Sequence, residues 1–258
     1  MDLGIRGKVA LVTASSGGMG KNIATTLAAE GANIVLFARS QDKLQSVAAE
    51  IEQQYGVRAL AVPGDMQKAT DIDRLVSTIQ QEFNSLDIAV LNSGRPPAPL
   101  RATVNETEEG RWLESFNTQL WSTIQVAQRV HPIMEKGGWG RIIAITSASV
   151  AQPMPHHALS TVFRAGVTAY MKHLANEVGT RGVTVNCVAP ALIETPHRTG
   201  SAAYTPEQAD ARKKMTVLGR MGHQEELCAV VAFLASVQAG FVTGSTVRVD
   251  GGMVGSLF

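Results

Sequence analysis

A stretch from Val9 to Gly20, Val-Ala-Leu-Val-Thr-Ala-Ser-Ser-Gly-Gly-Met-Gly, constrains the fold of this chain more than any other. Its first four residues are apolar and partly β-branched, which predicts a buried parallel strand. The glycines at 17, 18 and 20 allow a tight turn and a close backbone approach to a ligand. The residues that follow form an apolar helical face that ends at Gly31. A strand, a glycine turn and a helix start place free N–H groups where a pyrophosphate binds. We therefore interpret the turn as a dinucleotide site, the alternative being a turn without a ligand.

Short apolar runs continue to alternate with amphipathic segments along the chain. Further strands are predicted at 33–37, 57–62, 86–91, 141–146, 183–188 and 245–249. Helices are predicted at 41–55, 70–83, 105–136, 156–180 and 225–237, with an irregular or short-helical region over 190–215. This order predicts an α/β fold, namely a single-domain Rossmann-type doubly wound parallel sheet of about seven strands with helices on both faces, over residues 1–258. Ligands of such sheets bind at the carboxyl ends of the strands.

The overall composition is that of an ordinary soluble protein. Hydrophobic residues make up 45% of the 258 positions and charged residues 17%, with a formal charge of +1. Since no basic stripe is present, we expect neither nucleic acid nor an anionic membrane as a partner. The N-terminus lacks the apolar core of a signal peptide, and no run is long enough to span a bilayer. Cys187 and Cys228 lie in apolar surroundings, which fits buried thiols in a reducing cytoplasm, and no metal site is predicted.

The residues after the predicted strands carry further motifs. Thr13, Ala14, Gly18 and Gly20 follow the pattern Thr-Gly-x-x-x-Gly-x-Gly, with alanine at the first glycine. Other matching segments are Asn92-Ser93-Gly94, Pro190-Ala191 with Thr195, and the closing Val249-Asp250-Gly251-Gly252. Through these motifs nearly the whole chain resembles the short-chain dehydrogenase/reductase family, and in particular its 3-oxoacyl-carrier-protein reductases. The single methyl group of Ala14 is expected to shift the turn slightly without removing the site.

The resemblance implies which residues contact the cofactor. Besides Arg39, discussed below, they are Thr13, Ser15, Ser16, Gly18, Met19, Gly20, Asp65, Met66, Asn92, Ser93, Gly94, Arg164, Pro190, Ala191, Ile193 and Thr195. Asp65 matches the acid that the family places beside the adenine, and it equally suits a turn after Pro63-Gly64. The family also implies a homodimer or homotetramer.

The end of the second predicted strand bears on the choice of cofactor. A site for NAD(H) has an acid there for the ribose 2′-hydroxyl, whereas a site for NADP(H) uses arginine for the 2′-phosphate. This chain has Ala38-Arg39-Ser40 and no acid. We therefore predict that NADP(H) is favoured over NAD(H), the alternative being that Arg39 is a solvated surface residue.

The catalytic positions of the family are only partly kept. Ser147 ends the fifth predicted strand, where the family has its catalytic serine. The family's Tyr-x-x-x-Lys begins thirteen positions later, where this chain has Ser160 and Arg164. Asn117, in the preceding helix, is assigned to the remaining member of the family's catalytic tetrad. The resemblance thus implies catalytic roles for Asn117, Ser147, Ser160 and Arg164.

Proton supply is the chemical difficulty of such a site. A serine hydroxyl has a far higher pKa and a shorter reach than the tyrosine phenol, so Ser160 is not a simple replacement. Loss of a positioned general acid costs roughly 10²–10⁴ in rate. His157 precedes Ser160 by three residues and would share its helical face, which makes a Ser–His proton relay one solution. Tyr204 is a second candidate, and a pair of surface histidines at 156 and 157 is the alternative reading.

Three function classes follow from these residues. The first is an NAD(P)(H)-dependent oxidoreductase that interconverts a small-molecule carbonyl and an alcohol with an atypical proton donor. The second is a cofactor-binding lyase or isomerase, and the third is a catalytically silent dinucleotide-binding or regulatory protein. Retention of the cofactor motifs and of Ser147 favours the first class. Residues 190–215, polar and bounded by prolines, are expected to form a substrate lid.

Overall fold

Short apolar segments pair side by side to form a seven-stranded parallel sheet in the computed structural model, which describes residues 2–194 and 205–257. The strand order is β3-β2-β1-β4-β5-β6-β7. The strands are β1 (Val9–Thr13), β2 (Asn33–Ala38), β3 (Ala59–Pro63), β4 (Ile88–Leu91), β5 (Gly140–Ile145), β6 (Val183–Pro190) and β7 (Thr246–Val249). The predicted α/β fold with a doubly wound parallel sheet is confirmed. Three predicted strands begin later than expected, at Ala59, Ile88 and Thr246.

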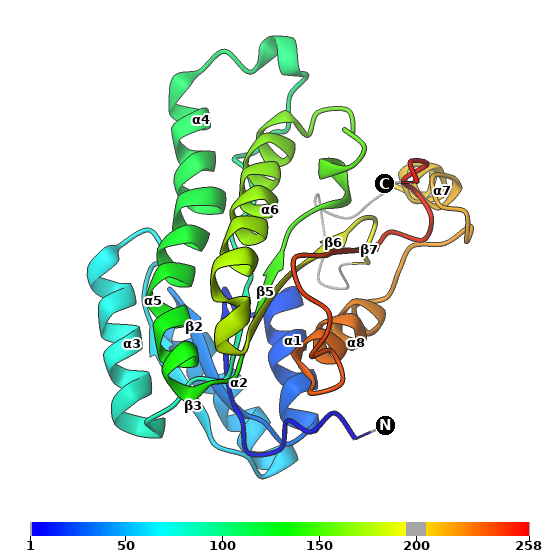
Figure 1. Ribbon diagram of the computed structural model, residues 1–258. Coiled ribbons are helices and arrows are strands. Elements are labelled where there is room, and N and C mark those ends of the chain that lie inside the picture. Colours follow the sequence, from blue (N-terminus) through cyan, green and yellow to red (C-terminus); the bar gives the residue numbers. More distant parts are fainter. Residues whose placement is uncertain (1, 195–204, 258) are drawn as a thin grey trace.

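Helices cover both faces of the sheet (Figure 1). One apolar core lies between the sheet and α1 (Gly18–Ala29), α2 (Gln41–Tyr55) and α8 (Gln224–Ala235). A second core lies between the opposite face and α3 (Ala69–Phe83), α5 (Ser122–Gly137) and α6 (Ala158–Val178). Two shorter helices, α4 (Glu109–Ser115) and α7 (Pro206–Lys214), complete the helices of the described residues. No helix in this part of the chain is long and apolar enough to cross a membrane.

The strands read as continuous apolar runs because both of their faces are buried. In β1, Ala10 and Val12 belong to the first core, whereas Val9 and Leu11 belong to the second. Successive side chains of a strand point to opposite faces, so one short run serves both layers. This double burial explains why the strand positions were predictable from composition alone.

The predicted helix over 105–136 is divided in the structure. A 3-10 turn at Thr103–Asn105 precedes α4, and a π-helical turn at Phe116–Trp121 joins α4 to α5. Glu106 lies before α4 and does not open a helix, because its carboxylate is buried against Arg111. A π-helical turn inside a helix is uncommon and occurs frequently at functional sites.

The order of the strands reverses between β1 and β4. From β1 the chain first adds β2 and β3 on one side, and β4 to β7 then extend the other side. Crossovers on the two sides of this point diverge, which leaves a crevice beyond the carboxyl ends of the strands. The glycine turn follows β1 directly, so it lies at this crevice.

The glycine turn packs closely on the strand that precedes it. A Cβ at Gly20 would overlap with the carbonyl oxygen of Ala14, so only glycine fits at this position. Ala14 itself has a φ of 49°, a left-handed conformation that favours glycine. The turn thus contains an alanine in a left-handed conformation, and the shift expected there stays a prediction.

Replacing Ala14 by glycine relieves this strain. Ala14→Gly is expected to raise the free energy of unfolding by up to about 1 kcal/mol. The free energy that alanine loses in a left-handed conformation is larger than the stabilisation of the unfolded chain by the extra backbone entropy of glycine. The measurement is urea unfolding. The matched control is Ala49→Gly, at an exposed position in the interior of α2, which should lower the free energy of unfolding by about 1 kcal/mol. Equal destabilisation by both substitutions would contradict the strain at Ala14.

Candidate active site

The ends of β1 and its two neighbours are tied together beneath the glycine turn. The Thr13 hydroxyl donates to the carbonyl of Asn92 at 2.6 Å, which links β1 to the segment after β4. Ser15 is fully buried, its hydroxyl accepts the Phe37 N–H at 3.0 Å, and its own N–H donates to the Phe37 carbonyl. Ser15 therefore links β1 to β2, and its predicted contact with the cofactor stays a prediction.

A cavity of about 540 Å³ lies at the ends of β1 to β4, and we name it the β2-side cavity. Its walls include five of the predicted cofactor residues, namely Ser16, Arg39, Asp65, Met66 and Gly94. Lys43 and Arg95 add two further cations to Arg39, whereas Asp65 and Glu114 are the acids. The Asp65 carboxylate also accepts the Gln67 N–H at 3.0 Å, which is the turn role that its position after Pro63-Gly64 allowed.

A second cavity of about 540 Å³ lies between the glycine turn, α6 and the end of β6, and we name it the β6-side cavity. The structure brings together in its walls seven predicted residues, which are Gly18, Met19, His157, Ser160, Pro190, Ala191 and Ile193. Arg95 lines both cavities and therefore lies at their junction. The described walls of this cavity do not include Ser147, Asn117 or Arg164.

Ser147 follows β5 and begins a 3-10 turn. Its hydroxyl oxygen accepts the Ser149 N–H at 3.2 Å and the Ser149 hydroxyl at 2.9 Å. It is half-buried, in contrast to the fully buried Ser149. The serine predicted at the end of the fifth strand is thus held in place by its own turn.

Arg164 uses its guanidinium group to hold backbone. One terminal nitrogen donates to the Ile145 carbonyl at 2.5 Å and the other to the Gly94 carbonyl at 3.1 Å. The side chain is buried, which lowers the pKa of Arg164 to about 10, and arginine therefore stays charged at neutral pH. Arg164 ties the end of β5, just before Ser147, to the segment after β4.

The π-helical turn presents a buried polar residue that the sequence reasoning missed. Gln119 is fully buried, and neither its side-chain oxygen nor its nitrogen has a partner among the described residues. Asn117, the predicted catalytic residue, is only half-buried in the same turn, and its catalytic role stays a prediction. The available signal was the helical spacing of Ser115, Gln119 and Thr123, which places three polar residues on the face where core residues are expected.

Helix α6 begins later than predicted, at Ala158, so the two preceding histidines differ. His157 is the residue before the helix, and its Nδ1 lies 2.7 Å from the Pro155 carbonyl. His156 is exposed outside the helix with a φ of 63°. Of the two, only His157 lines the β6-side cavity with Ser160. The predicted Thr195 and Tyr204 lie outside the described residues.

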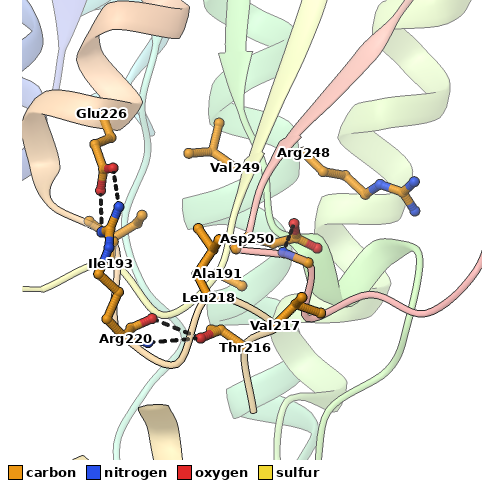
Figure 2. Close-up of a pocket in the computed structure, with 13 residues that line it drawn as sticks. Ala191, Ile193, Thr216, Val217, Leu218, Arg220, Glu226, Arg248, Val249 and Asp250 are labelled. Carbon is orange, nitrogen blue, oxygen red and sulfur yellow. Dashed lines mark hydrogen bonds and ion pairs between the residues drawn. The ribbon is translucent and has the colours of Figure 1, made fainter. Parts of the chain in front are cut away.

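A third cavity, of about 430 Å³, lies next to the end of β6 (Figure 2). It shares Ala191 and Ile193 with the β6-side cavity. In Figure 2 the Arg220 side chain reaches Glu226 through two contacts of 2.6 and 2.8 Å, and the Thr216 hydroxyl oxygen contacts the Arg220 backbone. These contacts fix residues 216–222, which connect α7 to α8. Helix α7 begins with a capping box of Thr205 and Gln208, and its Arg212 lines the β6-side cavity.

Comparison with known proteins agrees with this geometry. The family model described as "Enoyl-(Acyl carrier protein) reductase" matches residues 13–254, which is nearly the whole chain. The chain belongs to the short-chain dehydrogenase/reductase family. It is therefore an oxidoreductase of the short-chain dehydrogenase/reductase type, as the strand-end motifs predicted.

Curated relatives of this short-chain dehydrogenase/reductase include bacterial 3-oxoacyl-[acyl-carrier-protein] reductases. The 3-oxoacyl-[acyl-carrier-protein] reductase FabG of Staphylococcus epidermidis is 34% identical over 247 residues, which cover 95% of this chain and 98% of the relative. The FabG of Escherichia coli is 34% identical over 251 residues, which cover 97% and 99% of the two chains. Among solved structures, L-sorbose reductase from Gluconobacter frateurii, complexed with NADPH and L-sorbose, superposes with a TM-score of 0.92 at 32% identity over 100% of both chains.

The Arg220–Glu226 pair beside the third cavity gives this short-chain dehydrogenase/reductase a defined response to acid. Hydrogen bonds first from Arg220 and then from the His223 N–H lower the pKa of Glu226 to about 2. The stabilisation by this carboxylate is therefore complete above the ordinary value of 4.5 and is lost as the pH falls from about 4.5 to 2. Glu226→Gln should lower the free energy of unfolding at pH 6, and the difference from the parent protein should shrink at pH 4 and again at pH 3.

The measurement is urea unfolding at the three pH values. Glu225→Gln is the control, since Glu225 is the neighbouring acid on α8 and Arg220 pairs with Glu226. A Glu226→Gln difference that stays constant from pH 6 to pH 3 would contradict the lowered pKa.

Proposed function

We propose that this protein uses NADP(H), in preference to NAD(H), to interconvert a small-molecule carbonyl and an alcohol. The observation that carries the proposal is the pair of adjoining cavities at the carboxyl ends of the strands. The β2-side cavity has Arg39 and Lys43 in its wall, and the β6-side cavity contains Ser160 and His157. Arg95 at their junction supports one extended ligand that passes from the first cavity to the second.

The residues of the glycine turn and of β2 fit a dinucleotide phosphate. The backbone at Gly20 leaves no room for a side chain because α1 packs directly on the end of β1, which brings the helix start to the turn where a pyrophosphate would bind. Arg39 is exposed in the wall of the β2-side cavity and follows β2, where an arginine pairs with a 2′-phosphate and an acid would repel it. The solved L-sorbose reductase, which is described as a complex with NADPH, supports the same choice.

Bound in these cavities, the cofactor would supply a hydride to the carbonyl carbon of a substrate. The protein must then provide a proton for the carbonyl oxygen, and Ser160 and His157 are the candidates in the wall of the β6-side cavity. The contact of His157 Nδ1 with the Pro155 carbonyl requires a proton on Nδ1, which leaves Nε2 as an acceptor in the neutral ring. In alcohol oxidation, neutral His157 is thus suited to accept the Ser160 hydroxyl proton at Nε2 while Ser160 takes the proton of the substrate alcohol. In carbonyl reduction the protons move the opposite way: Ser160 gives its proton to the substrate oxygen and receives one from Nε2–H of protonated His157.

The remaining predicted residues support the reaction by position. Arg164 holds the backbone before Ser147 against Gly94, and its charge favours a developing oxyanion nearby.

We further propose that residues 190–215 act as a substrate lid, supported by the place of Arg212 of α7 in the cavity wall. The family's homodimer or homotetramer is proposed as well, supported by the exposed Leu113 and Trp121 on α4 and the π-helical turn.

Cofactor preference is tested at Arg39. Arg39→Ala is expected to weaken NADPH binding by about 1.5–3 kcal/mol, which is roughly tenfold or more, because a charge-assisted contact with the 2′-phosphate is lost. NADH binding should change little. Fluorescence titration of the nicotinamide measures both, and Arg58→Ala is the control, since Arg58 is an exposed arginine paired with Glu82 away from both cavities. Equal weakening of NADPH and NADH binding would count against the 2′-phosphate role.

Proton supply is tested by turnover on a panel of carbonyl compounds with NADPH. His157→Ala should lower kcat by roughly 10²-fold or more if the Ser–His relay operates, with NADPH binding retained. Ser160→Tyr should raise the rate, because it restores a phenol as proton donor. Unchanged turnover in both His157→Ala and Ser160→Ala would rule out the relay.

The alternatives are distinguished by the same assays. Binding of neither dinucleotide would reject both the oxidoreductase and the cofactor-binding lyase or isomerase. Tight NADPH binding without turnover of any carbonyl would instead favour a dinucleotide-binding regulatory protein. Ser160 and Arg164 lie at positions where the family resemblance predicts Tyr and Lys. This difference is the reason to keep a dinucleotide-binding regulatory protein as the second candidate function.

A further inference from the structure

The segment between β4 and α4 includes residues 95–100, which have few backbone N–H groups to bond their own carbonyls. Residues 96, 97 and 99 are prolines, which lack an N–H group, so local turns or strands have few donors for the carbonyls here. The segment runs from the end of β4 to the start of α4 (Figure 1). Residues 96 and 97 are half-buried and 98–100 are exposed, so water can reach part of this backbone, and an additional protein donor is what would fix its position.

Arg111, in the first turn of α4, supplies these donors from one guanidinium group. Its terminal nitrogens donate to the carbonyls of Pro97 at 3.2 Å, Ala98 at 3.4 Å and Pro99 at 2.7 Å. Three successive carbonyls are thus held by a single side chain. Only a planar group with several fixed N–H bonds achieves this, so lysine is not an equivalent residue.

Glu106 holds the guanidinium from the opposite side. Its two carboxylate oxygens accept from Nε and a terminal nitrogen of Arg111, both at 2.8 Å, and both side chains are buried. The hydrogen bonds from Arg111 lower the pKa of Glu106, so the pair stays ionised at neutral pH. The Glu106 carbonyl also accepts the indole N–H of Trp112 at 2.8 Å, which fixes the residue that orients Arg111.

The held segment forms one side of the β6-side cavity. Arg95, Pro96, Ala98 and Leu100 line this cavity opposite residues of α6 and of the β6 end. The Arg111 guanidinium contacts the backbone between these wall residues and is not itself a lining residue of either cavity. Its effect on a ligand is therefore exerted through the position of the wall.

We propose that Arg111, oriented by Glu106, is a positioning residue that fixes the 95–100 wall of the β6-side cavity and thereby sets its selectivity for substrate. The identity of that cavity as the substrate site rests on the proposed function. The bond between Arg111 and three carbonyls does not depend on that function and is testable without a substrate.

Arg111→Lys is the first variant. With the best carbonyl substrate of the panel, its KM should rise roughly tenfold while kcat and the Kd for NADPH change less than about threefold, because the wall is displaced and the cofactor cradle is not. The matched control is Arg101→Lys, on the same segment, where the arginine pairs with Glu108 and holds no backbone carbonyl among the described residues. A KM within twofold of the parent protein would overturn the proposal.

A second variant separates positioning from simple stability. Arg111→Met with Glu106→Leu replaces the buried pair by apolar side chains of similar size, which leaves no buried charge unpaired. It should unfold at a Tm close to that of the parent protein and still show the raised KM. A KM equal to that of the parent protein in a folded double variant would overturn the role of Arg111. So would a variant in which kcat falls, KM rises and NADPH binding weakens by similar factors.

Cleavage by trypsin after Arg101 provides a readout without any substrate. In the folded protein, Arg111→Lys should speed this cleavage by roughly tenfold, because the preceding carbonyls are released from the guanidinium. An unchanged cleavage rate would overturn the proposal even if the protein reduces no carbonyl. If the parent protein turns over no carbonyl but the variant is cleaved faster, the proposed function is rejected. The role of Arg111 in holding residues 95–100 is then retained.

Discussion

The close contact between Gly20 and the backbone of Ala14 is the constraint on which the rest of the site depends. Helix α1 starts directly against the end of β1 because no side chain separates them. This contact sets the opening of the crevice at the point where the strand order reverses. Both cavities border the turn, since Ala14 lines the β2-side cavity and Gly18 lines the β6-side cavity. A strained alanine at 14 is tolerated because the packing around it determines the backbone.

Two buried arginines hold the loops around this crevice. Arg164 joins the carbonyls of Ile145 and Gly94, and Arg111 joins those of Pro97, Ala98 and Pro99. In both cases a rigid fork of N–H donors holds loop backbone, and Arg164 also holds the end of β5. The segment from Gly94 to Pro99 is thereby held at both ends. Arg164, at the position predicted for the family's lysine, therefore supports the architecture of the site through these backbone contacts.

The two halves of the proposed site are predicted to differ in how closely they follow the family. The walls of the two cavities include residues of the glycine turn, a basic residue after β2 and residues after β4 and β6, which the proposed cofactor half would use. In the proposed proton-transfer half, Ser160 lies at the position predicted for the family's tyrosine, with His157 in the same cavity wall. Binding and orientation of a cofactor depend mostly on backbone shape. Proton transfer depends on the pKa of single side chains, which substitution changes directly.

Local pattern in the sequence determined the strands, the helices, the glycine turn and the residues that follow each strand. These features depend on side-chain periodicity and on glycine conformation, which neighbouring residues carry. Only the tertiary structure decided that Ser15 bonds to Phe37 and that Glu106 pairs with Arg111 instead of opening a helix. It also decided that the buried Gln119 side chain has no hydrogen-bond partner within residues 2–194 and 205–257. The tertiary structure also decided that His157, and not His156, lines the β6-side cavity. Each of these outcomes depends on which polar groups meet in space, and periodicity describes which face a residue occupies but not the partner that it finds there.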